Sequence, residues 1–344
     1  MSDSALSALY SKMQNSTGPL WWFADEQVSD EMPSRREDCW VFSNRCDTAA
    51  GLTAAGFNVA LGDFDIDAAG AAAPATICYR VSKEKPLVHF LINEAARRLP
   101  IGGVLLLSGF KNDGLKTYAD KAAKMLSTAS NVRKMSGNAY VAELVKQVEP
   151  EHFLPDSDYR ELRQIATEPL LFSKPGIYGW QKQDRGSALL IDSLGSFLDG
   201  FTQRPRSLAD LGCGYGYLPV MASAQLPDSH WLLTDNNATA LLACAKNVEA
   251  HGLSAELYLA DCAEGVSGPV DAVLCNPPFH QGFAVEGSLT ERFLAATHRL
   301  LRNDGQALFV VNQFIPLQRK AEGLFSHSEV IADRDGFRVI RLRK

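Results

Sequence analysis

The chain has 344 residues, of which 46% are hydrophobic and 22% charged, and its formal net charge is −6 at pH 7. This length exceeds what one hydrophobic core usually organises, so we expect two domains of ordinary globular composition. The polar N-terminus argues against a signal peptide, and no apolar run is long enough to predict a membrane span. Seven cysteines without a CxxC pair predict reduced thiols, no structural metal and a cytoplasmic protein.

Strands and helices are predicted to alternate along the first half. Residues 74–86 predict a strand, and residues 87–114 predict a helix, a turn at Gly102 and Gly103, and an apolar strand. Residues 130–146 predict a β-hairpin around Gly137.

The second half repeats this order. Residues 270–278 predict a strand, residues 289–314 a helix, a polar turn at Gly305 and an apolar strand, and residues 328–344 a hairpin around Gly336. Corresponding glycines of the two halves lie about 200 residues apart in both pairs. We therefore expect a tandem duplication of one α/β domain, with a chance similarity of two α/β units as the alternative.

Prolines, acids and polar residues cluster at residues 146–162, which predicts a domain boundary. We expect a first domain at residues 1–155 and a second at residues 156–344. The alternation predicts the α/β class, with two tandem domains that each have a mainly parallel sheet and helices on both faces. Each terminal hairpin would add an antiparallel edge.

Residues 207–225 predict a short strand, a glycine-rich turn and a helix. Gly212, Gly214 and Gly216 form a GxGxG pattern, in which glycine permits a tight turn and lets a ligand approach the backbone beside a helix N-terminus. The third glycine comes one residue earlier than in the GxGxxG of nicotinamide enzymes, which does not favour a dinucleotide.

Three aspartates accompany successive predicted strands. Asp210 lies inside the first, where it could meet a ligand ammonium group directly or through water. Asp235 ends the next strand, where an acid can accept both hydroxyls of a ribose, and Asp261 ends the third, where it could meet an adenine amino group. Each alone is more often a cap or turn residue, but in this order they indicate a ligand site at the carboxyl edge of the sheet.

The stretch 271–283, DAVLCNPPFHQGF, predicts a strand that stops abruptly. Prolines donate no backbone hydrogen bond and hold the preceding residue extended. The strand tip would present the Asn276 carboxamide, the Pro277 carbonyl and the Phe279 ring, which suit a flat group carrying an amine. An ordinary turn that contains prolines is the alternative.

Residues 207–282 resemble class I S-adenosylmethionine-dependent methyltransferases, with DLGCGYG, Asp235, Asp261 and NPPF in the expected order. The [ND]PP[FYW] signature is typical of enzymes that methylate planar nitrogen. NPPFH with Gly282 close behind, the degenerate first half and the overall length resemble the bacterial ribosomal RNA small subunit methyltransferase C family, whose members methylate guanine N2 in 16S rRNA. The resemblance covers nearly the whole chain.

This resemblance implies roles for individual residues. Asn276, Pro277 and Phe279 would be catalytic, the first two by accepting the hydrogens of guanine N2 and the third by stacking on the base. Pro278 and His280 would contact the substrate, with simple packing as the alternative for His280, and a paired base would have to be flipped out. The residues implied to bind S-adenosylmethionine are Asp210, Gly212, Gly214, Gly216, Asp235, Asn236, Asp261, Cys262 and Asn276.

One segment departs from the family pattern. A compact family segment before the cofactor strand is expanded here to FSKPGIYGWQKQDRGSALL at residues 172–190. Five positions still match, and we expect a reshaped loop beside the cofactor. The matching residues are Phe172, Ser173, Asp184, Gly186 and Ser187.

The first half keeps the plan of the second without its motifs. Residues 40–52 are expected where the glycine loop should stand and residues 79–86 where NPPF should stand, so we expect no cofactor there. Residues 111–134 hold six basic against two acidic residues, and Arg97 and Arg98 are nearby. Lys116, Lys121 and Lys124 are expected to contact RNA phosphates. A solvated helix face, or a purely structural first half, is the alternative.

We therefore expect a monomeric cytoplasmic methyltransferase that acts on 16S rRNA or the small ribosomal subunit, without metal or membrane. The alternatives are a guanine-N2 methyltransferase of 23S rRNA and a non-catalytic RNA-binding assembly factor with this fold. An adenine-N6 DNA methyltransferase or a release-factor glutamine methyltransferase does not match the duplicated plan. A nicotinamide oxidoreductase leaves NPPF unexplained.

Overall fold

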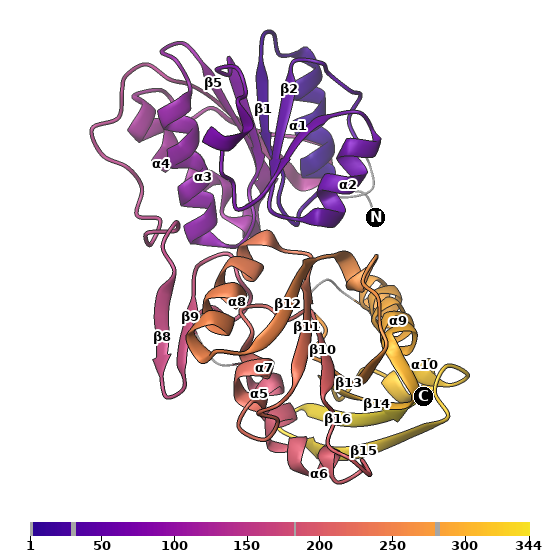
Figure 1. The fold of residues 1–344 in the computed structure, drawn as a ribbon. Coiled ribbons are helices and arrows are strands. Elements are labelled where there is room, and N and C mark those ends of the chain that lie inside the picture. The colour runs from indigo at the N-terminus through magenta and orange to yellow at the C-terminus, as the bar shows by residue number, and fades with distance from the viewer. Residues whose placement is uncertain (1–2, 29–31, 182–183, 279–282) are drawn as a thin grey trace. The chain divides into compact units, whose positions relative to one another are not determined.

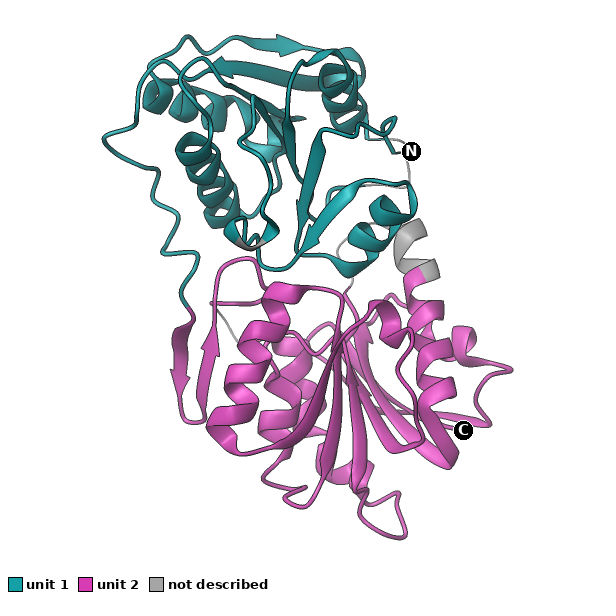
Figure 2. Cartoon of the chain, turned by 45° about the horizontal axis from the view of Figure 1, so that its top comes forward, with its two compact units in different colours: residues 1–161 teal, residues 162–344 magenta. Residues whose placement is uncertain are grey.

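The computed structural model describes residues 3–28, 32–181, 184–278 and 283–344. The chain divides into two compact units, unit 1 at residues 1–161 and unit 2 at residues 162–344 (Figure 2). Each unit is built on a seven-stranded sheet (Figure 1). The strand orders are β3-β2-β1-β4-β5-β7-β6 and β12-β11-β10-β13-β14-β16-β15, which are the same order twice.

Unit 1 contains four α-helices and seven strands among its described residues. The helices are α1 (Ser4–Asn15), α2 (Cys46–Ala54), α3 (Lys85–Arg98) and α4 (Leu115–Leu126). The strands are β1 (Leu20–Phe23), β2 (Cys39–Ser43), β3 (Asn58–Leu61), β4 (Thr76–Arg80), β5 (Val104–Phe110), β6 (Val132–Lys134) and β7 (Ala139–Val145).

Unit 2 opens with a two-stranded hairpin of β8 (Arg163–Thr167) and β9 (Leu170–Ser173). Its helices are α5 (Arg185–Asp192), α6 (Leu194–Leu198), α7 (Tyr217–Ala222), α8 (Ala238–His251), α9 (Phe283–Leu300) and α10 (Leu317–Ala321). The strands of its large sheet are β10 (Ser207–Leu211), β11 (His230–Asp235), β12 (Ser254–Leu259), β13 (Val270–Cys275), β14 (Leu301–Asn312), β15 (His327–Arg334) and β16 (Phe337–Arg343).

Both sheets are parallel except for the terminal hairpins, β6–β7 and β15–β16, which join antiparallel. The hairpin turns contain Gly137 and Gly336 with φ of 65° and 84°, backbone geometry that glycine adopts readily. The predicted α/β fold, with duplicated mainly parallel sheets and closing hairpins, is confirmed.

Helices cover both faces of each sheet, so each unit buries apolar side chains in two layers (Figure 1). In unit 1, Leu9 of α1 and Leu52 of α2 lie in one layer, and Leu91 of α3 lies in the other. In unit 2, α5 to α8 contribute to one layer, and α9 and α10 to the other. The central strand β1 is buried on both sides, which explains its unbroken apolar sequence, LWWF.

The chain that leaves unit 1 is bound to α3. Asn93 exchanges two hydrogen bonds with the backbone of Leu154, both at 2.9 Å. Phe90 stacks on Tyr159 with 4.5 Å between ring centroids, and His89 Nδ1 lies 2.7 Å from the Pro155 carbonyl oxygen. These contacts attach residues 153–160 to unit 1, which ends at Glu161.

The predicted correspondence of residues 40–52 to the glycine loop is wrong. β1 has the central position of β10, and β2 has the position of β11, so residues 40–52 correspond to the strand that ends at Asp235. The sequence LWWF hides β1 because all four residues are buried and show no alternation. Residues 79–86 cover the end of β4 and the residues after it. As expected, β4 is the counterpart of β13.

The sequence predicts reduced cysteines, no structural metal and no membrane span. The seven cysteines, all within described ranges, are free thiols, and five of them are buried. The described residues hold no cluster of three or more His, Cys, Asp or Glu able to ligate a metal. Among the helices of the described ranges, none has the length and hydropathy of a membrane span.

Candidate active site

The glycine loop follows β10 at the carboxyl edge of the sheet in unit 2. Gly212 N–H donates to the Thr234 carbonyl at 2.8 Å, which ties the loop to β11. Gly212, Gly214 and Gly216 have φ of 76°, 56° and 84°. A Cβ at Gly216 would lie 3.0 Å from Cys244 Sγ, whereas one at Gly214 would meet nothing within 4 Å. A ligand can therefore approach the backbone at Gly214.

Asp235 supports this loop from the end of β11. Its Oδ2 accepts a hydrogen bond from Gly214 N–H at 2.9 Å, and its Oδ1 accepts one from Asn237 N–H at 2.9 Å. The Ala260 N–H donates to the Asp235 carbonyl at 2.9 Å, which brings the ends of β11 and β12 together. The carboxylate is therefore held at the edge where open α/β sheets bind ligands.

Asp210 lies within β10 and is fully buried. Neither of its carboxylate oxygens has a hydrogen-bond partner among the described residues. Burial, and secondarily the nearby charge of Asp235, raises the pKa of Asp210 well above its ordinary value. A buried carboxyl without a partner destabilises the fold, and a cationic ligand group at this edge would relieve that cost. Asp210 is thus suited to a cationic group of a ligand.

The other predicted cofactor residues lie at the ends of β11 and β12. Asn236 is half-buried next to Asp235. Asp261 and Cys262 belong to a short 3-10 helix, η4 (Asp261–Ala263), in which Cys262 is half-buried with φ of 45°. The Asp261 carboxylate forms an ion pair with Arg292 of α9, which fixes it beside the sheet edge.

The Asn276 carboxamide directly follows β13 and is held by the start of α5. Its Nδ2 donates to Asp184 Oδ2 at 2.7 Å and to Ser187 Oγ at 2.8 Å. A carboxylate only accepts hydrogen bonds, so the amide nitrogen faces α5. No described residue donates to Asn276 Oδ1, which leaves that oxygen to accept a hydrogen bond from a ligand. Parallel pairing of Leu211 with Cys275 places this group next to the glycine loop.

Asp184 has a second structural role as the N-cap of α5. The same Oδ2 accepts the Ser187 N–H at 2.7 Å, so one oxygen both caps the helix and binds Asn276. Tyr178, in the expanded segment, is 64% exposed, and desolvation followed by the charge of Asp184 raises its pKa. The sequence marks Asp184 and Ser187 as family matches, but no local pattern connects them with a residue about 90 positions away.

The rest of the NPPF motif is described in part. Pro277 is buried and Pro278 is exposed. Phe279, His280 and Gly282 lie outside the described residues, so the roles expected for Phe279 and His280 stay predictions.

Asn247 of α8 connects β9 with the glycine loop. Its Oδ1 accepts the Phe172 N–H at 2.7 Å, and its Nδ2 donates to the carbonyl oxygens of Phe172 at 2.8 Å and Tyr215 at 2.7 Å. The side chain is fully buried. β9, whose last two residues begin the expanded segment, is thereby bound to the loop that would hold the cofactor.

In unit 1, Arg80 occupies the position that corresponds to Asn276. Its guanidinium is buried and binds Asp3 Oδ2 at 2.9 Å and Asp113 Oδ2 at 2.7 Å. Asp25, after β1, is also buried and accepts the Tyr79 hydroxyl at 2.7 Å, and burial is the main cause that raises its pKa to about 6. This edge of unit 1 is occupied by internal polar contacts.

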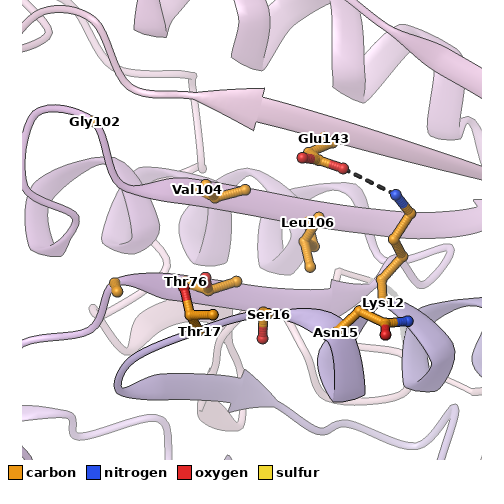
Figure 3. A pocket seen from close by; sticks show the side chains of 10 residues that line it. Lys12, Asn15, Ser16, Thr17, Thr76, Gly102, Val104, Leu106 and Glu143 are labelled. Atoms are coloured by element: carbon orange, nitrogen blue, oxygen red, sulfur yellow. Dashed lines mark hydrogen bonds and ion pairs between the residues drawn. The ribbon is translucent and has the colours of Figure 1, made fainter.

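A cavity of about 350 Å³ in unit 1 lies at the opposite edge of the sheet (Figure 3). Thr76 and Val104, at the starts of β4 and β5, line it together with Lys12 and Glu143, whose charged groups pair at 3.0 Å. Ligand sites of open α/β sheets lie at the carboxyl ends of strands. This cavity therefore does not belong to the candidate active site.

The basic residues of unit 1 differ in how accessible they are. Lys116 and Lys124 are exposed on α4 and form no ion pair with any described residue. Lys121 is half-buried, with its Nζ 3.4 Å from His89 Nε2. Arg97 and Arg98 both pair with Glu94, which reduces the charge they offer a partner.

Comparison with known proteins assigns this arrangement to a class. The family model described as "Methyltransferase small domain" matches residues 169–341, half of the chain, including the glycine loop and the Asn276 segment. Unit 2 is therefore a methyltransferase domain. The chain as a whole belongs to the ribosomal RNA small subunit methyltransferase C family, which confirms the assignment made from sequence.

Two relatives and one solved structure illustrate this membership. Ribosomal RNA small subunit methyltransferase C of Pseudomonas paraeruginosa is 31% identical over 76% of this chain and 77% of its own. The protein of the same name from Ectopseudomonas mendocina is 31% identical over 76% of this chain and 77% of its own. The T. thermophilus 16S rRNA N2 G1207 methyltransferase, solved with AdoMet and guanosine, has the same fold, with a TM-score of 0.81 and 21% identity over 99% of this chain and 92% of its own.

Proposed function

We propose that this protein transfers a methyl group from S-adenosylmethionine to N2 of a guanine in 16S rRNA. The observation that carries the proposal is the Asn276 carboxamide, whose nitrogen is bound to α5 and whose oxygen is left as an acceptor at the carboxyl edge. An exocyclic amine is the donor that such an acceptor binds. Membership of the small subunit methyltransferase C family supports the choice of substrate.

The cofactor would bind along the carboxyl edge of unit 2. Asp210 would face its ammonium group, Gly214 would leave room for its close approach, and Asp235 and Asp261 would accept hydrogen bonds from its nucleoside. The further contacts proposed are Gly212, Gly216, Asn236, Cys262 and Asn276. When bound, S-adenosylmethionine supplies a methyl group on a positively charged sulfur.

The protein's own contribution would be to orient the acceptor amine. The guanine N2 lone pair is delocalised into the ring, so the amine is a weak nucleophile. Asn276 Oδ1 and the Pro277 carbonyl oxygen would each accept one N2 hydrogen, and the Phe279 ring would stack on the base. Holding two reactants in line lowers the barrier by several kcal/mol without a strong general base. The amine's proton becomes acidic once the methyl has transferred and leaves to water.

Unit 1 would dock the RNA. Lys116 and Lys124 are exposed on α4 and form no ion pair with a described residue, which suits contact with phosphates. The Lys116 ammonium group lies 4.8 Å from the centroid of the Tyr140 ring, which leaves its charge available. Lys121 would contribute less, because it is half-buried beside His89. We propose no cofactor for unit 1, since Arg80 and its two aspartates occupy the edge that corresponds to the active site.

The substrate implies where and how the protein would act. We propose that it works in the cytoplasm, where the small ribosomal subunit is found, and that one chain suffices because both the Asn276 group and the glycine loop come from unit 2.

The proposal is tested by incubating the full chain with radiolabelled S-adenosylmethionine and 30S subunits, 50S subunits, or protein-free 16S and 23S rRNA from cells that lack the modification. N2-methylguanine in small-subunit RNA is the expected product. Label only in 23S rRNA would show that the protein methylates the large-subunit RNA instead. No label despite measured cofactor binding would reject an RNA substrate.

A further inference from the structure

We infer that Asp184 is a positioning residue that fixes the orientation of the Asn276 carboxamide, and through it the requirement for an amino group on the substrate base. The inference rests on the proposed function and extends it to a residue outside NPPF. Asp184 touches Asn276 but not the reacting atoms, so it acts through another side chain.

A carboxamide can turn by half a revolution and exchange its oxygen and nitrogen with little change in shape. The two orientations have opposite chemistry, since the oxygen accepts a hydrogen bond and the NH₂ group donates. With Nδ2 of Asn276 at 2.7 Å from Asp184 Oδ2, the turned orientation would place two acceptor oxygens in contact with no hydrogen between them. Charge repulsion at that distance disfavours it.

Ser187 contacts the same nitrogen but cannot select the orientation. Its Oγ lies 2.8 Å from Asn276 Nδ2, and a hydroxyl both donates and accepts. Ser187 would therefore satisfy either orientation by rotating its hydrogen, whereas the Asp184 carboxylate satisfies only one.

Asp184 is itself well fixed. Its Oδ2 caps α5 through the Ser187 N–H at 2.7 Å, and α5 packs into the core through Leu189 and Leu190, which are 5% and 0% exposed. A group that orients a reacting partner has to be rigid in this way.

The consequence is a rule for the substrate base. With its nitrogen occupied, Asn276 offers only an acceptor, so a base without an exocyclic amine at this point leaves Oδ1 unpaired. Sites built to bind an N–H reject analogues that lack it. Inosine, which is guanosine without the 2-amino group, is the matching probe.

We would compare the wild type with Asp184→Asn, Asp184→Ala and Ser187→Ala, each as the full chain. The control is Asp192→Ala at the other end of α5, where the exposed Asp192 pairs with Arg334 at 2.7 Å. Calorimetry would measure the binding of guanosine and inosine to protein saturated with S-adenosylhomocysteine. Single-turnover methyl transfer to small-subunit RNA and cofactor affinity would be measured on the same proteins.

The wild type and Asp192→Ala should bind guanosine at least about tenfold more tightly than inosine. Asp184→Ala should lose this preference because it binds guanosine more weakly and inosine equally well. It should also transfer methyl at least about tenfold more slowly, with unchanged affinity for the cofactor. Asp184→Asn, which keeps the helix cap but loses the charge, should fall between, and Ser187→Ala should retain the preference.

Three results would overturn the inference, and they are distinguishable. If both Asp184 variants keep the guanosine preference and the transfer rate, Asp184 does not orient Asn276, while the proposed function stands. If Asp184→Asn lowers the affinity for both nucleosides and for the cofactor alike, the role of Asp184 is only structural. If the wild type itself does not distinguish guanosine from inosine, the proposed recognition of N2 fails, and the inference fails with it.

Discussion

Arg80 takes in unit 1 the place that Asn276 takes in unit 2. In each sheet, the last residue of the central strand, β1 or β10, pairs with a residue of the neighbouring strand. Arg80 and Asn276 come directly after that neighbouring residue. In unit 2 that place holds an amide oxygen to which no described residue donates, and in unit 1 it holds a guanidinium bound by Asp3 and Asp113. The same position is thus proposed to bind a ligand in one copy of the fold, and it stabilises the other copy through internal ion pairs.

Removing Arg80 should destabilise unit 1 strongly. Arg80→Ala leaves the buried Asp113 carboxylate and the partly buried Asp3 carboxylate without their partner, which costs about 3–5 kcal/mol. Urea denaturation followed by circular dichroism measures the loss. Arg133→Ala, at an exposed strand residue, is the control and should change stability by less than about 0.5 kcal/mol. Equal stability of both variants would contradict a structural role for the ion cluster.

Asp25 should make the stability of unit 1 depend on pH. Its pKa is raised from 3.8 to about 6, so the folded state holds a proton that the unfolded state has released between these values. The contribution of Asp25 to the free energy of unfolding is therefore fully present below about pH 4. It falls by about 3 kcal/mol as the pH rises to about 6. The difference in unfolding free energy between wild type and Asp25→Asn, measured from pH 4 to 7, should show this fall. A difference that is constant with pH would refute it.

Asp210→Asn should separate stability from cofactor binding. The change removes an unpartnered buried carboxyl without altering its shape, so the melting temperature of the free protein should rise at neutral pH. The same variant should bind S-adenosylmethionine at least about tenfold more weakly, because the ammonium group loses its counter-charge. Thermal melting with and without cofactor measures both effects. A variant that is less stable and binds normally would exclude this role.

Asn276→Ala should reduce turnover far more than cofactor binding, because Asn276 is only one of several residues proposed to contact S-adenosylmethionine. Without the carboxamide oxygen the acceptor amine is no longer oriented, and methyl transfer should fall by at least about a hundredfold. Rapid-quench methyl transfer and equilibrium binding of S-adenosylmethionine test the two halves of this statement. Near-normal turnover would remove Asn276 from the mechanism.

Charge reversal on α4 should weaken RNA binding. The double change Lys116→Glu and Lys124→Glu should lower affinity for 16S rRNA and reduce the slope of log K against log salt by about two, one for each lost phosphate contact. Lys121→Glu should have a smaller effect, because its ammonium group already lies beside His89. A filter-binding salt series measures the slopes. Equal slopes in all proteins would place the docking surface elsewhere.

Local patterns predicted the repeating strand–helix order and both terminal hairpins. Glycine turns and apolar runs depend on neighbouring residues, and therefore remain visible in one sequence. The carboxyl-edge position of Asp210 and Asp235 also followed, because strands in a parallel sheet end on a common edge.

Two features depended on contacts that no local pattern contains. The bond between Asp184 and Asn276 joins distant segments through the packing of α5 against the sheet. The contact of Lys121 with His89, at 3.4 Å between Nζ and Nε2, joins two helices, so the sequence does not distinguish Lys121 from the other two lysines of α4. The counterpart of the glycine loop was misplaced because β1 is too short and too uniformly apolar to be recognised.

The three hydrogen bonds of Asn247 make one side chain a support for two parts of the candidate site. They join β9 to Tyr215 of the glycine loop, and β9 continues along the chain toward Asp184. The loop proposed for the methyl donor and the residues that hold Asn276 are therefore braced by the same buried carboxamide. The alignment of donor and acceptor thus depends on a residue that belongs to neither binding surface.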